Sequence, residues 1–458
     1  MFRRVLVANR GEIAARILRA CREMGIETVA VHSTADEGSP HLTLADRRIC
    51  LGPPQAARSY LDMDAVLQAA EQTECQAVHP GYGFLAENAL FAARCASQSL
   101  TFIGPPPRLI RTMGDKVEAR RTMRRAGVET IPGSDGLVAD VGEAARIADK
   151  VGYPVFLKAT AGGGGKGMRQ CEDEGGLKRN FPLASGEAAS AFGNPDLYVE
   201  KAIVGGRHIE FQILADAWGN SVHLGERECS VQRHHQKLIE ESPSPAMDPA
   251  TRQAIGASTA AALAGLGYVN AGTVEFLREP SGNLYFMEMN TRLQVEHPVT
   301  EEVTGIDIVK EQIRIAANER LSIAQDQIQI KGHALEFRLN AEDPDAGFRP
   351  SPGTITRFTA PVAARGVRLE THLNATADGA AGSAPYDVPP WYDSLIAKMI
   401  VSAPDRAGAI AAAVRALEAT RIEGIKTTLP LHLRVLKDPR FLSGAYDVTI
   451  LSSIMQGV

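Results

Sequence analysis

The order of apolar runs at the start of the chain restricts its fold more than any other feature. Residues 5–8 and 28–31 are short apolar runs of the kind found in buried strands, and apolar residues recur at helical spacing over residues 13–24 between them. A strand, a helix and a strand in this order are joined by a right-handed crossover, which makes the two strands parallel members of one sheet. The N-terminal part is therefore predicted to be an α/β domain.

Two further apolar runs, at residues 77–78 and 101–103, are expected to extend this sheet. The pattern of elements changes after them, so we predict a Rossmann-like α/β domain over residues 1–113. This domain contains no G-x-G-x-x-G fingerprint, which makes dinucleotide binding a poor interpretation.

The second predicted domain spans residues 114–329. Helical patterns precede an apolar strand at residues 155–158, and residues 197–290 are expected to be mostly strands. Two of these strands, at residues 272–277 and 284–289, flank a Pro-Ser-Gly-Asn turn and are expected to pair as a hairpin. Helices are expected at residues 116–126, 142–151 and 307–317.

The third predicted domain spans residues 330–458. Strands are expected at residues 333–339, 353–358 and 395–401, and an alanine-rich helix at residues 405–421. Residues 374–386 are mostly small and are expected to form a mobile loop. Three domains agree with the number that a length of 458 residues suggests.

Composition and charge exclude several classes of protein. The formal net charge of −5 provides no basic field that would hold nucleic acid. No apolar stretch is long enough to span a bilayer, and Asn9 and Arg10 interrupt the first apolar run too early for a signal peptide. The six cysteines form no C-x-x-C pair, and scattered single thiols are typical of a reducing compartment. We therefore expect a cytoplasmic protein that binds neither nucleic acid nor membrane.

A run of four glycines follows the strand predicted at residues 155–158. The run consists of Gly162, Gly163, Gly164 and Gly165. Such a run costs conformational entropy, and a mobile backbone whose N–H groups surround phosphate oxygens would account for that cost. Lys158 and Lys166 bracket the run and could neutralise phosphate charge. The spacing is not that of a Walker A loop, and a flexible linker is the alternative interpretation.

The predicted hairpin carries one acid within each apolar strand, Glu275 and Glu288. Alternate side chains of a strand share a face, so the two carboxylates can project to the same side of the hairpin. They repel each other unless a cation lies between them, and Asn290 adds a neutral oxygen nearby. Oxygen donors of this kind suit Mg²⁺ or Mn²⁺ bound to nucleotide phosphates. The alternative is that both acids face solvent.

Polar residues continue at alternate positions from Glu288 through Asn290, Arg292 and Gln294 to Glu296. In an extended segment these side chains would all point into one space. Arg292 supplies a planar guanidinium, which can bind a planar oxyanion through two hydrogen bonds. This density of mixed charge argues against an ordinary polar strand face.

Two further stretches are polar without pointing to one chemistry. Residues 226–241 include the adjacent histidines His234 and His235, whose spacing fits no zinc site, and a solvated charged loop would explain them. Arg338 is expected to share its strand face with Glu336 and Asn340. An ordinary salt bridge would explain this arginine.

Taken together, these stretches resemble the biotin carboxylase family of ATP-grasp enzymes. The resemblance covers nearly the whole chain. It rests on residues 8–14, 79–85, 113–116, 158–167, 226–241, 289–298, 338–344 and 389–394. It implies a pre-ATP-grasp domain, an ATP-grasp domain with a glycine-loop lid at about residues 131–203, and a C-terminal biotin carboxylase domain.

The resemblance also implies roles for single residues. ATP would contact the four glycines together with Lys116, Lys158, Glu200, Lys201, Ile203, His208, Gln232, His235 and Leu277. Mg²⁺ or Mn²⁺, as two ions, would be bound by Glu275, Glu288 and Asn290. Bicarbonate and biotin would contact Lys237, Arg292, Gln294, the backbone of Val295, Arg338 and Tyr82. Glu296 would be the general base and Arg338 would stabilise the biotin enolate, with Arg292 and Lys237 completing the catalytic set.

The implied activity is that of a ligase. ATP would phosphorylate bicarbonate to carboxyphosphate, whose carbon dioxide would then carboxylate biotin. The chain contains no Ala-Met-Lys-Met biotinylation motif, and Lys398 lies in an apolar strand. The biotin carrier and the carboxyltransferase are therefore expected on other chains, unless this chain is a fragment of a longer one, and the enzyme is expected to be a homodimer.

Three questions stay open at this point. The final acceptor could be acetyl-CoA, propionyl-CoA or pyruvate. Another bicarbonate-activating ATP-grasp ligase, such as a relative of carbamoyl phosphate synthase, is an alternative from the same class. A non-catalytic ATP-binding assembly subunit is an alternative from a different class, although intact Glu296, Arg292 and Arg338 argue against it.

Overall fold

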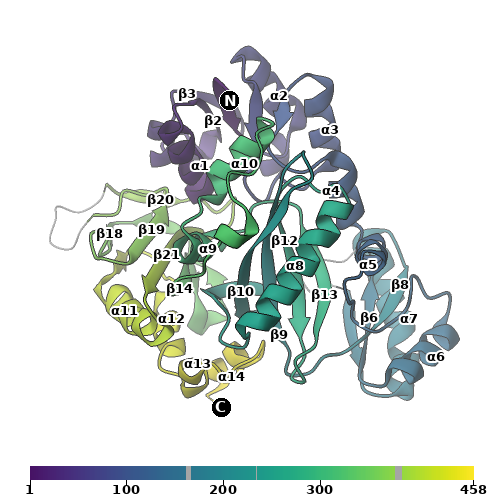
Figure 1. The fold of residues 1–458 in the computed structure, drawn as a ribbon. Coiled ribbons are helices and arrows are strands. Elements are labelled where there is room, and N and C mark those ends of the chain that lie inside the picture. Colours follow the sequence, from purple (N-terminus) through teal and green to yellow (C-terminus); the bar gives the residue numbers. More distant parts are fainter. Residues whose placement is uncertain (161–166, 234, 377–383, 458) are drawn as a thin grey trace.

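The computed structural model of the chain describes residues 1–160, 167–233, 235–376 and 384–457. The predicted phosphate loop, Gly162 to Gly165, lies outside the described residues, as do His234 and most of the loop predicted at residues 374–386. These expectations stay predictions. Figure 1 shows the N-terminal elements at the top, a small α/β unit at the lower right, and the C-terminal elements at the lower left of a central sheet.

The N-terminal part contains a five-stranded parallel sheet in the order β3-β2-β1-β4-β5. Its elements are β1 (Arg4–Val7), α1 (Gly11–Glu23), β2 (Glu27–Ser33), β3 (Arg47–Gly52), α2 (Met63–Gln72), β4 (Ala77–His79), α3 (Ala89–Ser97), β5 (Thr101–Phe102) and α4 (Pro107–Gly114). The predicted strand, helix and parallel strand are confirmed. The sequence does not predict β3, because this strand lies at the sheet edge and its apolar run is only three residues long, at residues 49–51.

A small unit with its own hydrophobic core follows α5 (Lys116–Arg125). Its three strands pair antiparallel in the order β7-β6-β8. The elements are α6 (Val141–Val151), β6 (Val155–Ala159), β7 (Met168–Cys171), α7 (Glu174–Phe192) and β8 (Leu197–Lys201). Leu157, Leu177 and Val199 are fully buried in this core. The sequence does not predict α7, which contains Pro182 and several glycines.

An eight-stranded sheet occupies the centre of the molecule in the order β13-β12-β9-β10-β11-β14-β21-β19 (Figure 1). Its strands are β9 (Arg207–Ala215), β10 (Ser221–Arg233), β11 (Gln236–Ser242), β12 (Asn270–Arg278), β13 (Leu284–Asn290), β14 (His333–Asn340), β19 (Val367–Thr371) and β21 (Leu395–Ala403). β12 and β13 form the predicted hairpin. Because β11 pairs with β14, the sheet continues across the domain boundary predicted at residue 330.

The region predicted as mostly strands, residues 197–290, also contains a long helix, α8 (Pro249–Gly265). Its sequence is rich in alanine and small polar residues, so no clear apolar stripe marks it. The available signal was its start, where the Asp248 carboxylate accepts hydrogen bonds from the N–H groups of Ala250 and Thr251, and Pro249 occupies the first turn.

The predicted strand at residues 353–358 is divided into β17 (Gly353–Ile355) and β18 (Arg357–Thr359). The two halves pair with different partners, β20 (Tyr386–Val388) and β22 (Arg421–Glu423). The other helical and apolar patterns predicted in the C-terminal half are confirmed by β14, β21, α10 (Ile308–Ala316) and α11 (Arg406–Ala419). The remaining elements are α9 (His297–Thr304), α10 (Ile308–Ala316), β15 (Glu342–Asp343), β16 (Arg349–Pro350), α11 (Arg406–Ala419), α12 (Leu429–Val435), α13 (Pro439–Ser443) and α14 (Ile450–Gln456).

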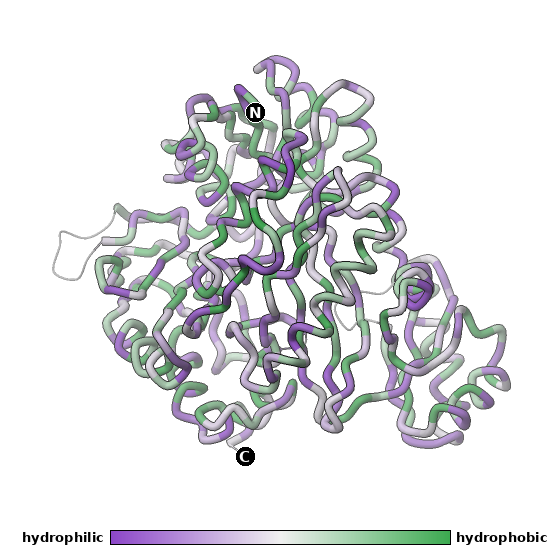
Figure 2. The backbone as a smooth tube through the Cα atoms, in the orientation of Figure 1, coloured by the Kyte–Doolittle hydropathy of each residue, from purple (hydrophilic) through white to green (hydrophobic). Residues whose placement is uncertain are grey.

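The hydrophobic residues are distributed in short runs through all parts of the fold (Figure 2). On the C-terminal side, Leu335, Phe337 and Leu339 of β14 point into one core, as their alternation with polar residues predicts. In the part of the chain that the structure describes, no helix has the length and apolar character needed to cross a membrane.

The Glu241 carboxylate connects the central sheet to the C-terminal helices. It lies at the end of β11 and accepts hydrogen bonds from His333 Nε2 at 2.6 Å, from Arg406 Nε at 2.7 Å, and from the Tyr446 hydroxyl. Burial disfavours its charge, but the hydrogen bonds from His333 and Arg406 outweigh burial and lower its pKa to about 2. The ionised form of Glu241 is therefore part of the folded state.

The depressed pKa of Glu241 predicts a pH-dependent contribution to stability. The contribution is present above the ordinary carboxyl pKa of 4.5 and is lost as pH falls toward about 2. A shift of this size corresponds to about 3 kcal/mol. Glu241→Gln should lower the thermal midpoint at pH 7 and flatten its decline between pH 4.5 and 2, measured by circular dichroism. The exposed Glu418→Gln is the control, and equal pH profiles for both variants would contradict the prediction.

Candidate active site

Three carboxylates form a row across adjacent strands of the central sheet. In the strand register, Glu275 of β12 lies directly opposite Glu210 of β9 on one side and Glu288 of β13 on the other. The predicted placement of Glu275 and Glu288 on one side of a hairpin is therefore confirmed. Glu210 was not predicted, although it alternates with His208 and Gln212 along β9, which is the same signal that marked the hairpin acids.

The ammonium group of Lys237 lies among the carboxylates. Its Nζ atom is 2.8 Å from Glu275 Oε1 and 2.7 Å from Glu296 Oε1, and it also contacts the Glu210 carboxylate. Burial alone would lower the pKa of Lys237, but the three carboxylates raise it well above its usual value. Lys237 is thus a permanent cation that keeps these acids ionised in the interior.

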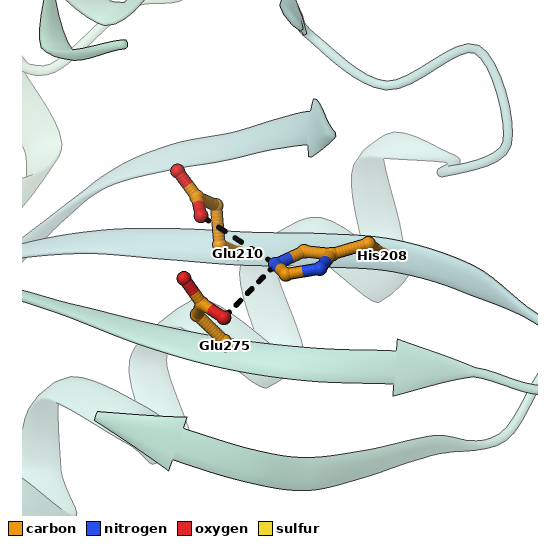
Figure 3. A group of neighbouring side chains, drawn as sticks. All are labelled: His208, Glu210 and Glu275. Carbon is orange, nitrogen blue, oxygen red and sulfur yellow. Dashed lines mark ion pairs between the residues drawn. The ribbon is translucent and has the colours of Figure 1, made fainter. Parts of the chain in front are cut away.

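His208, Glu210 and Glu275 lie close enough to share a metal ion, as Figure 3 shows. His208 Nε2 is 3.2 Å from Glu275 Oε2 and 3.7 Å from Glu210 Oε2. Burial opposes the charge of His208, but these acids outweigh burial and raise its pKa to about 9. With this raised pKa, the His208 imidazole is a second buried cation beside the carboxylates.

Arg227 is the third cation beneath the carboxylates, and its side chain is fully buried. Its guanidinium donates to Glu210 Oε1 at 2.5 Å, to Gln212 Oε1 at 2.9 Å and to the hydroxyl of Thr300 at 2.9 Å. The solvated charged loop offered as an alternative for residues 226–241 is wrong, because residues 221–233 form the buried strand β10 and residues 236–242 form β11. Burial of the whole strand could not be predicted from its polar composition.

The predicted metal ligands, Glu275, Glu288 and Asn290, lie at one end of the carboxylate row. Asn290 Nδ2 donates to Glu275 Oε1 at 2.8 Å. Among the described residues, the Glu288 carboxylate has no hydrogen-bond or ion-pair partner, and burial and then the Glu275 charge raise its pKa. A divalent cation bound by oxygen atoms would remove this repulsion, so the donor set fits Mg²⁺ or Mn²⁺.

The segment after Asn290 differs from the extended conformation predicted for residues 288–296. β13 ends at Asn290, and α9 begins at His297 after a turn in which His297 Nδ1 is 2.7 Å from the Gln294 carbonyl oxygen. The polar side chains still converge, because Arg292 is 3.2 Å from Asn290 Oδ1 and 3.4 Å from Gln294 Oε1. The Gln294 amide nitrogen is buried without a hydrogen-bond partner among the described residues, and it is available to an oxyanion.

Arg292 also has a partner that the sequence pattern did not indicate. Its Nε atom donates to Glu87 Oε2 at 2.8 Å, across 205 residues of chain. Glu87 belongs to the N-terminal part, and its carboxylate also accepts a hydrogen bond from the Thr291 N–H at 3.0 Å. The loop that follows β13 is therefore attached to the N-terminal part of the molecule.

Glu296 and Arg338 form a direct ion pair at 2.9 Å. Arg338 Nε also donates to Glu240 Oε1 at 2.7 Å, so its partners are Glu240 and Glu296 rather than the nearby residues that an ordinary strand salt bridge would use. Burial and the Glu210 charge oppose ionisation of Glu296, but Lys237 and Arg338 outweigh them and lower its pKa. Burial raises the pKa of Glu240 to about 7 despite its contact with Arg338.

The residues predicted to contact ATP lie around the small unit and the carboxylate row. Glu200 of β8 forms ion pairs with Lys158 and, at 3.0 Å, with Arg120. Burial opposes the ionisation of Glu200, but Lys158 and Arg120 outweigh burial and lower its pKa. The charge of Lys116, at the start of α5, favours the ionised forms of both Glu200 and Glu288. Lys116 therefore lies between the small unit and β13.

The remaining residues predicted to contact ATP lie at several places in the fold. Ile203 and Leu277 both lie against Gly206, and Gln232 is buried at the end of β10. Lys201 Nζ donates to the carbonyl oxygens of Gly152 and Tyr153, at 2.9 Å each, so its ammonium is occupied within the small unit. His235 begins the turn into β11 with a positive φ of 67°.

Tyr82 and the Val295 backbone, the predicted contacts on the biotin and bicarbonate side, have buried partners. The Tyr82 hydroxyl donates to Glu12 of α1. The Val295 carbonyl oxygen accepts a hydrogen bond from Lys398 Nζ of β21 at 2.7 Å. Both sites therefore connect to segments far away in the sequence.

A parallel α/β sheet, a small antiparallel unit and a large sheet that carries carboxylates and lysines together define an ATP-grasp enzyme. The family models "Biotin carboxylase, N-terminal domain" and "Biotin carboxylase C-terminal domain" match residues 1–110 and 336–453. The model "Carbamoyl-phosphate synthase L chain, ATP binding domain" matches residues 115–324 between them. The chain belongs to the biotin carboxylase family, which confirms the predicted resemblance, fold class and enzyme class.

Relatives with similar sequence and structure span almost the entire chain. The biotin carboxylase of Nostoc sp. is 53% identical over 453 residues, covering 99% of each chain. A pyruvate carboxylase subunit of Methanothermobacter thermautotrophicus is 48% identical, and the match covers 100% of this chain and 91% of the relative. The biotin carboxylase domain dimer of Hydrogenobacter thermophilus 2-oxoglutarate carboxylase, solved with MgADP, ADP and bicarbonate, has a TM-score of 0.91, 48% identity and 99% coverage of both chains.

The central position of Lys237 predicts a large loss of stability on its removal. Lys237→Met would leave Glu210, Glu275 and Glu296 as neighbouring buried carboxylates without their shared cation. Breaking a buried ion pair on one side costs about 3–5 kcal/mol, so the thermal midpoint should fall clearly. The exposed Lys426→Met is the matched control in differential scanning fluorimetry. Equal midpoints for the two variants would show that the Lys237 contacts contribute little to folding.

Proposed function

We propose that this protein uses ATP and bicarbonate to carboxylate biotin on a carrier, the first half-reaction of a biotin-dependent carboxylase. The observation that carries the proposal is the buried Glu296 carboxylate between Lys237 and Arg338. An ionised carboxylate can accept a proton from bicarbonate, and the neighbouring arginine can stabilise an oxyanion in the same site. Membership of the biotin carboxylase family supports this chemistry.

Bicarbonate is proposed to bind beside Glu296. The donors are the Lys237 ammonium, the Arg292 guanidinium, the unpartnered Gln294 amide nitrogen and the backbone at Val295. A planar guanidinium and an amide suit a planar oxyanion. Glu296 would take the bicarbonate proton and make the anion nucleophilic toward the terminal phosphorus of ATP, which releases ADP and gives carboxyphosphate.

ATP is proposed to lie between the small unit, as a lid, and the central sheet. The contributing residues are Lys116, Lys158, Gly162, Gly163, Gly164, Gly165, Glu200, Lys201, Ile203, His208, Gln232, His235 and Leu277. Lys158 would exchange its contact with Glu200 for phosphate, and a closed lid would keep water from carboxyphosphate. Glu275, Glu288 and Asn290 would hold Mg²⁺ or Mn²⁺, as two ions, which neutralise phosphate charge.

Biotin is proposed to enter on the side of Tyr82 and Arg338. Carboxyphosphate would release carbon dioxide and phosphate, and the phosphate would accept the ureido proton of biotin. Arg338 would then stabilise the biotin enolate, whose nitrogen attacks carbon dioxide. Burial and the Glu12 charge raise the pKa of the Tyr82 hydroxyl, and the Arg338 charge acts in the opposite direction.

The proposed partners are a biotin carrier and a carboxyltransferase on other chains, with this chain as a homodimer in the cytoplasm. The pyruvate carboxylase relative and the 2-oxoglutarate carboxylase domain are of similar length to this chain. Their names state two different acceptors of the carboxyl group, pyruvate and 2-oxoglutarate. A carbamoyl phosphate synthase relative is disfavoured, because the family models on both sides of the ATP-binding region are those of biotin carboxylase. A non-catalytic assembly protein is the other alternative, and the intact Glu296 and Arg338 argue against it.

Free biotin is expected to stimulate bicarbonate-dependent ADP release, because biotin consumes the carbon dioxide that carboxyphosphate releases. A coupled ADP assay at saturating ATP measures this, with bicarbonate omitted as the control. A rate that does not respond to saturating biotin would contradict biotin carboxylation. A rate of ADP release that does not respond to bicarbonate would contradict the whole proposal. No ADP release under any of these conditions would favour a non-catalytic ATP-binding protein.

Variants of Glu296 and Arg338 should affect different steps of the reaction, bicarbonate activation and biotin carboxylation. Glu296→Gln is expected to reduce ADP and carboxybiotin formation together, because both follow bicarbonate activation. Arg338→Gln is expected to lower the rate of carboxybiotin formation by about 10²–10³-fold, because one charge-stabilising donor is lost. The rate of ADP formation should fall less. ADP and carboxybiotin are measured in the same reaction.

The partly exposed Arg357→Gln is the matched control for Arg338→Gln, since Arg357 forms a long ion pair with Glu423 at 3.6 Å near the surface. Thermal midpoints of all variants are recorded alongside the activities. Parallel loss of both products in Arg338→Gln, together with a lowered midpoint, would assign Arg338 to stability instead of catalysis.

A further inference from the structure

A fully buried lysine, Lys398, lies in β21 and is not among the residues with a role in the proposed reaction. Its neighbours along the strand, Ile396, Ala397, Met399 and Ile400, are all buried apolar residues. Lysine is almost never fully buried without a partner. The position of its ammonium group therefore calls for an explanation.

The Lys398 ammonium has two partners from distant segments. Nζ donates to the Val295 carbonyl oxygen at 2.7 Å and is 3.2 Å from Glu12 Oε1 of α1. Glu12 in turn accepts the hydrogen bond from the Tyr82 hydroxyl. One buried ammonium thus connects the C-terminal part, the N-terminal part and the loop that leads to Glu296.

Lys398 lies directly opposite Arg338 in the register of β21 and β14. Side chains of such a cross-strand pair are on the same sheet face. Arg338 contacts the carboxylate of Glu296, and Lys398 contacts the main chain of Val295, the residue before it. Two neighbouring strands therefore present two cations to two consecutive residues of one loop.

The contact with Val295 constrains the geometry of the loop. The peptide group between Val295 and Glu296 is planar, so holding its carbonyl oxygen also sets the direction in which the chain enters Glu296. Glu296 immediately precedes α9, and Gln294 immediately precedes Val295. The Lys398 contact therefore lies between Gln294 and Glu296, the two residues of this loop that are assigned to bicarbonate.

Stability alone does not account for a lysine at this position. Replacing a buried ion pair by apolar residues of similar volume is often neutral or stabilising. An apolar residue at position 398 would match the rest of β21 and leave the sheet pairing unchanged. The charged group is used here to contact one specific carbonyl oxygen in the loop of the site.

We propose that Lys398 is a positioning residue for bicarbonate activation, which orients the loop of Gln294, Val295 and Glu296 through the Val295 carbonyl oxygen. This inference rests on the proposed function, since it assigns that loop to bicarbonate. Lys398 does not touch the reacting atoms in this scheme. Its loss should weaken the productive binding of bicarbonate while leaving the ATP side of the site intact.

The test compares Lys398→Met, Glu12→Gln and the double variant Lys398→Met/Glu12→Gln with the wild-type protein. Methionine keeps the length of the side chain without its charge, and the second change removes the charge of the carboxylate that would otherwise be left without its cation. Biotin-stimulated ADP release gives KM for bicarbonate and KM for ATP, and the thermal midpoint is measured for each variant. Glu12→Gln alone keeps the contact between Lys398 and Val295 and is the matched control.

Both variants that lack Lys398 are expected to raise KM for bicarbonate by about 10-fold or more, because a charge-assisted hydrogen bond is lost, while KM for ATP changes little. Glu12→Gln should keep KM for bicarbonate close to the wild-type value. A folded double variant with wild-type KM for bicarbonate would overturn the inference. A double variant that fails to fold, or that loses affinity for ATP and bicarbonate equally, would assign Lys398 to stability alone. If the wild-type protein releases ADP without any bicarbonate dependence, the proposed function itself has failed.

Discussion

The contact of Lys237 with Glu210, Glu275 and Glu296 is the interaction on which the rest of the site depends. Carboxylates this close together in the interior would repel each other or take up protons if they had no common cation. His208 and Arg227 add positive charge at the same acids. The balance lowers the pKa values of Glu210, Glu275 and Glu296 and so favours their ionised forms, which a site for a divalent cation and phosphates requires.

This arrangement requires the continuous central sheet. The acids come from β9, β12 and β13, Lys237 comes from β11, and Arg338 and Lys398 come from β14 and β21. Antiparallel pairing aligns these residues across strands, and the rigid sheet holds their charged groups at fixed separations. The pairing of β11 with β14 brings the Arg338 guanidinium to Glu296, which no element within the ATP-binding region alone would provide.

Local patterns predicted the parts of the fold that depend on neighbouring residues. The parallel N-terminal sheet followed from apolar runs at strand and helix spacing, and the hairpin followed from a turn between two apolar strands. Helices α7 and α8 were missed because neither carries a clear apolar stripe. The edge strand β3 was missed because its apolar run is short and only Ile49 and Leu51 pack against the core, each partly buried. In each case the missing signal was hydrophobic periodicity.

The sequence by itself determined the residue types of the site and the hairpin that carries Glu275 and Glu288, because the turn and the two apolar strands are local signals. The register shift between Glu275 and Phe276, which brings Glu288 opposite Glu275, could not be predicted from the period of the strands. Only the tertiary structure decided their partners: Glu87 for Arg292, Glu240 for Arg338, Glu210 for Lys237, and the Val295 carbonyl oxygen for Lys398. These contacts join segments separated by 27 to 205 residues. The physical reason is that charge pairing in a protein interior depends on distance in space and on burial, and spacing along the chain specifies neither.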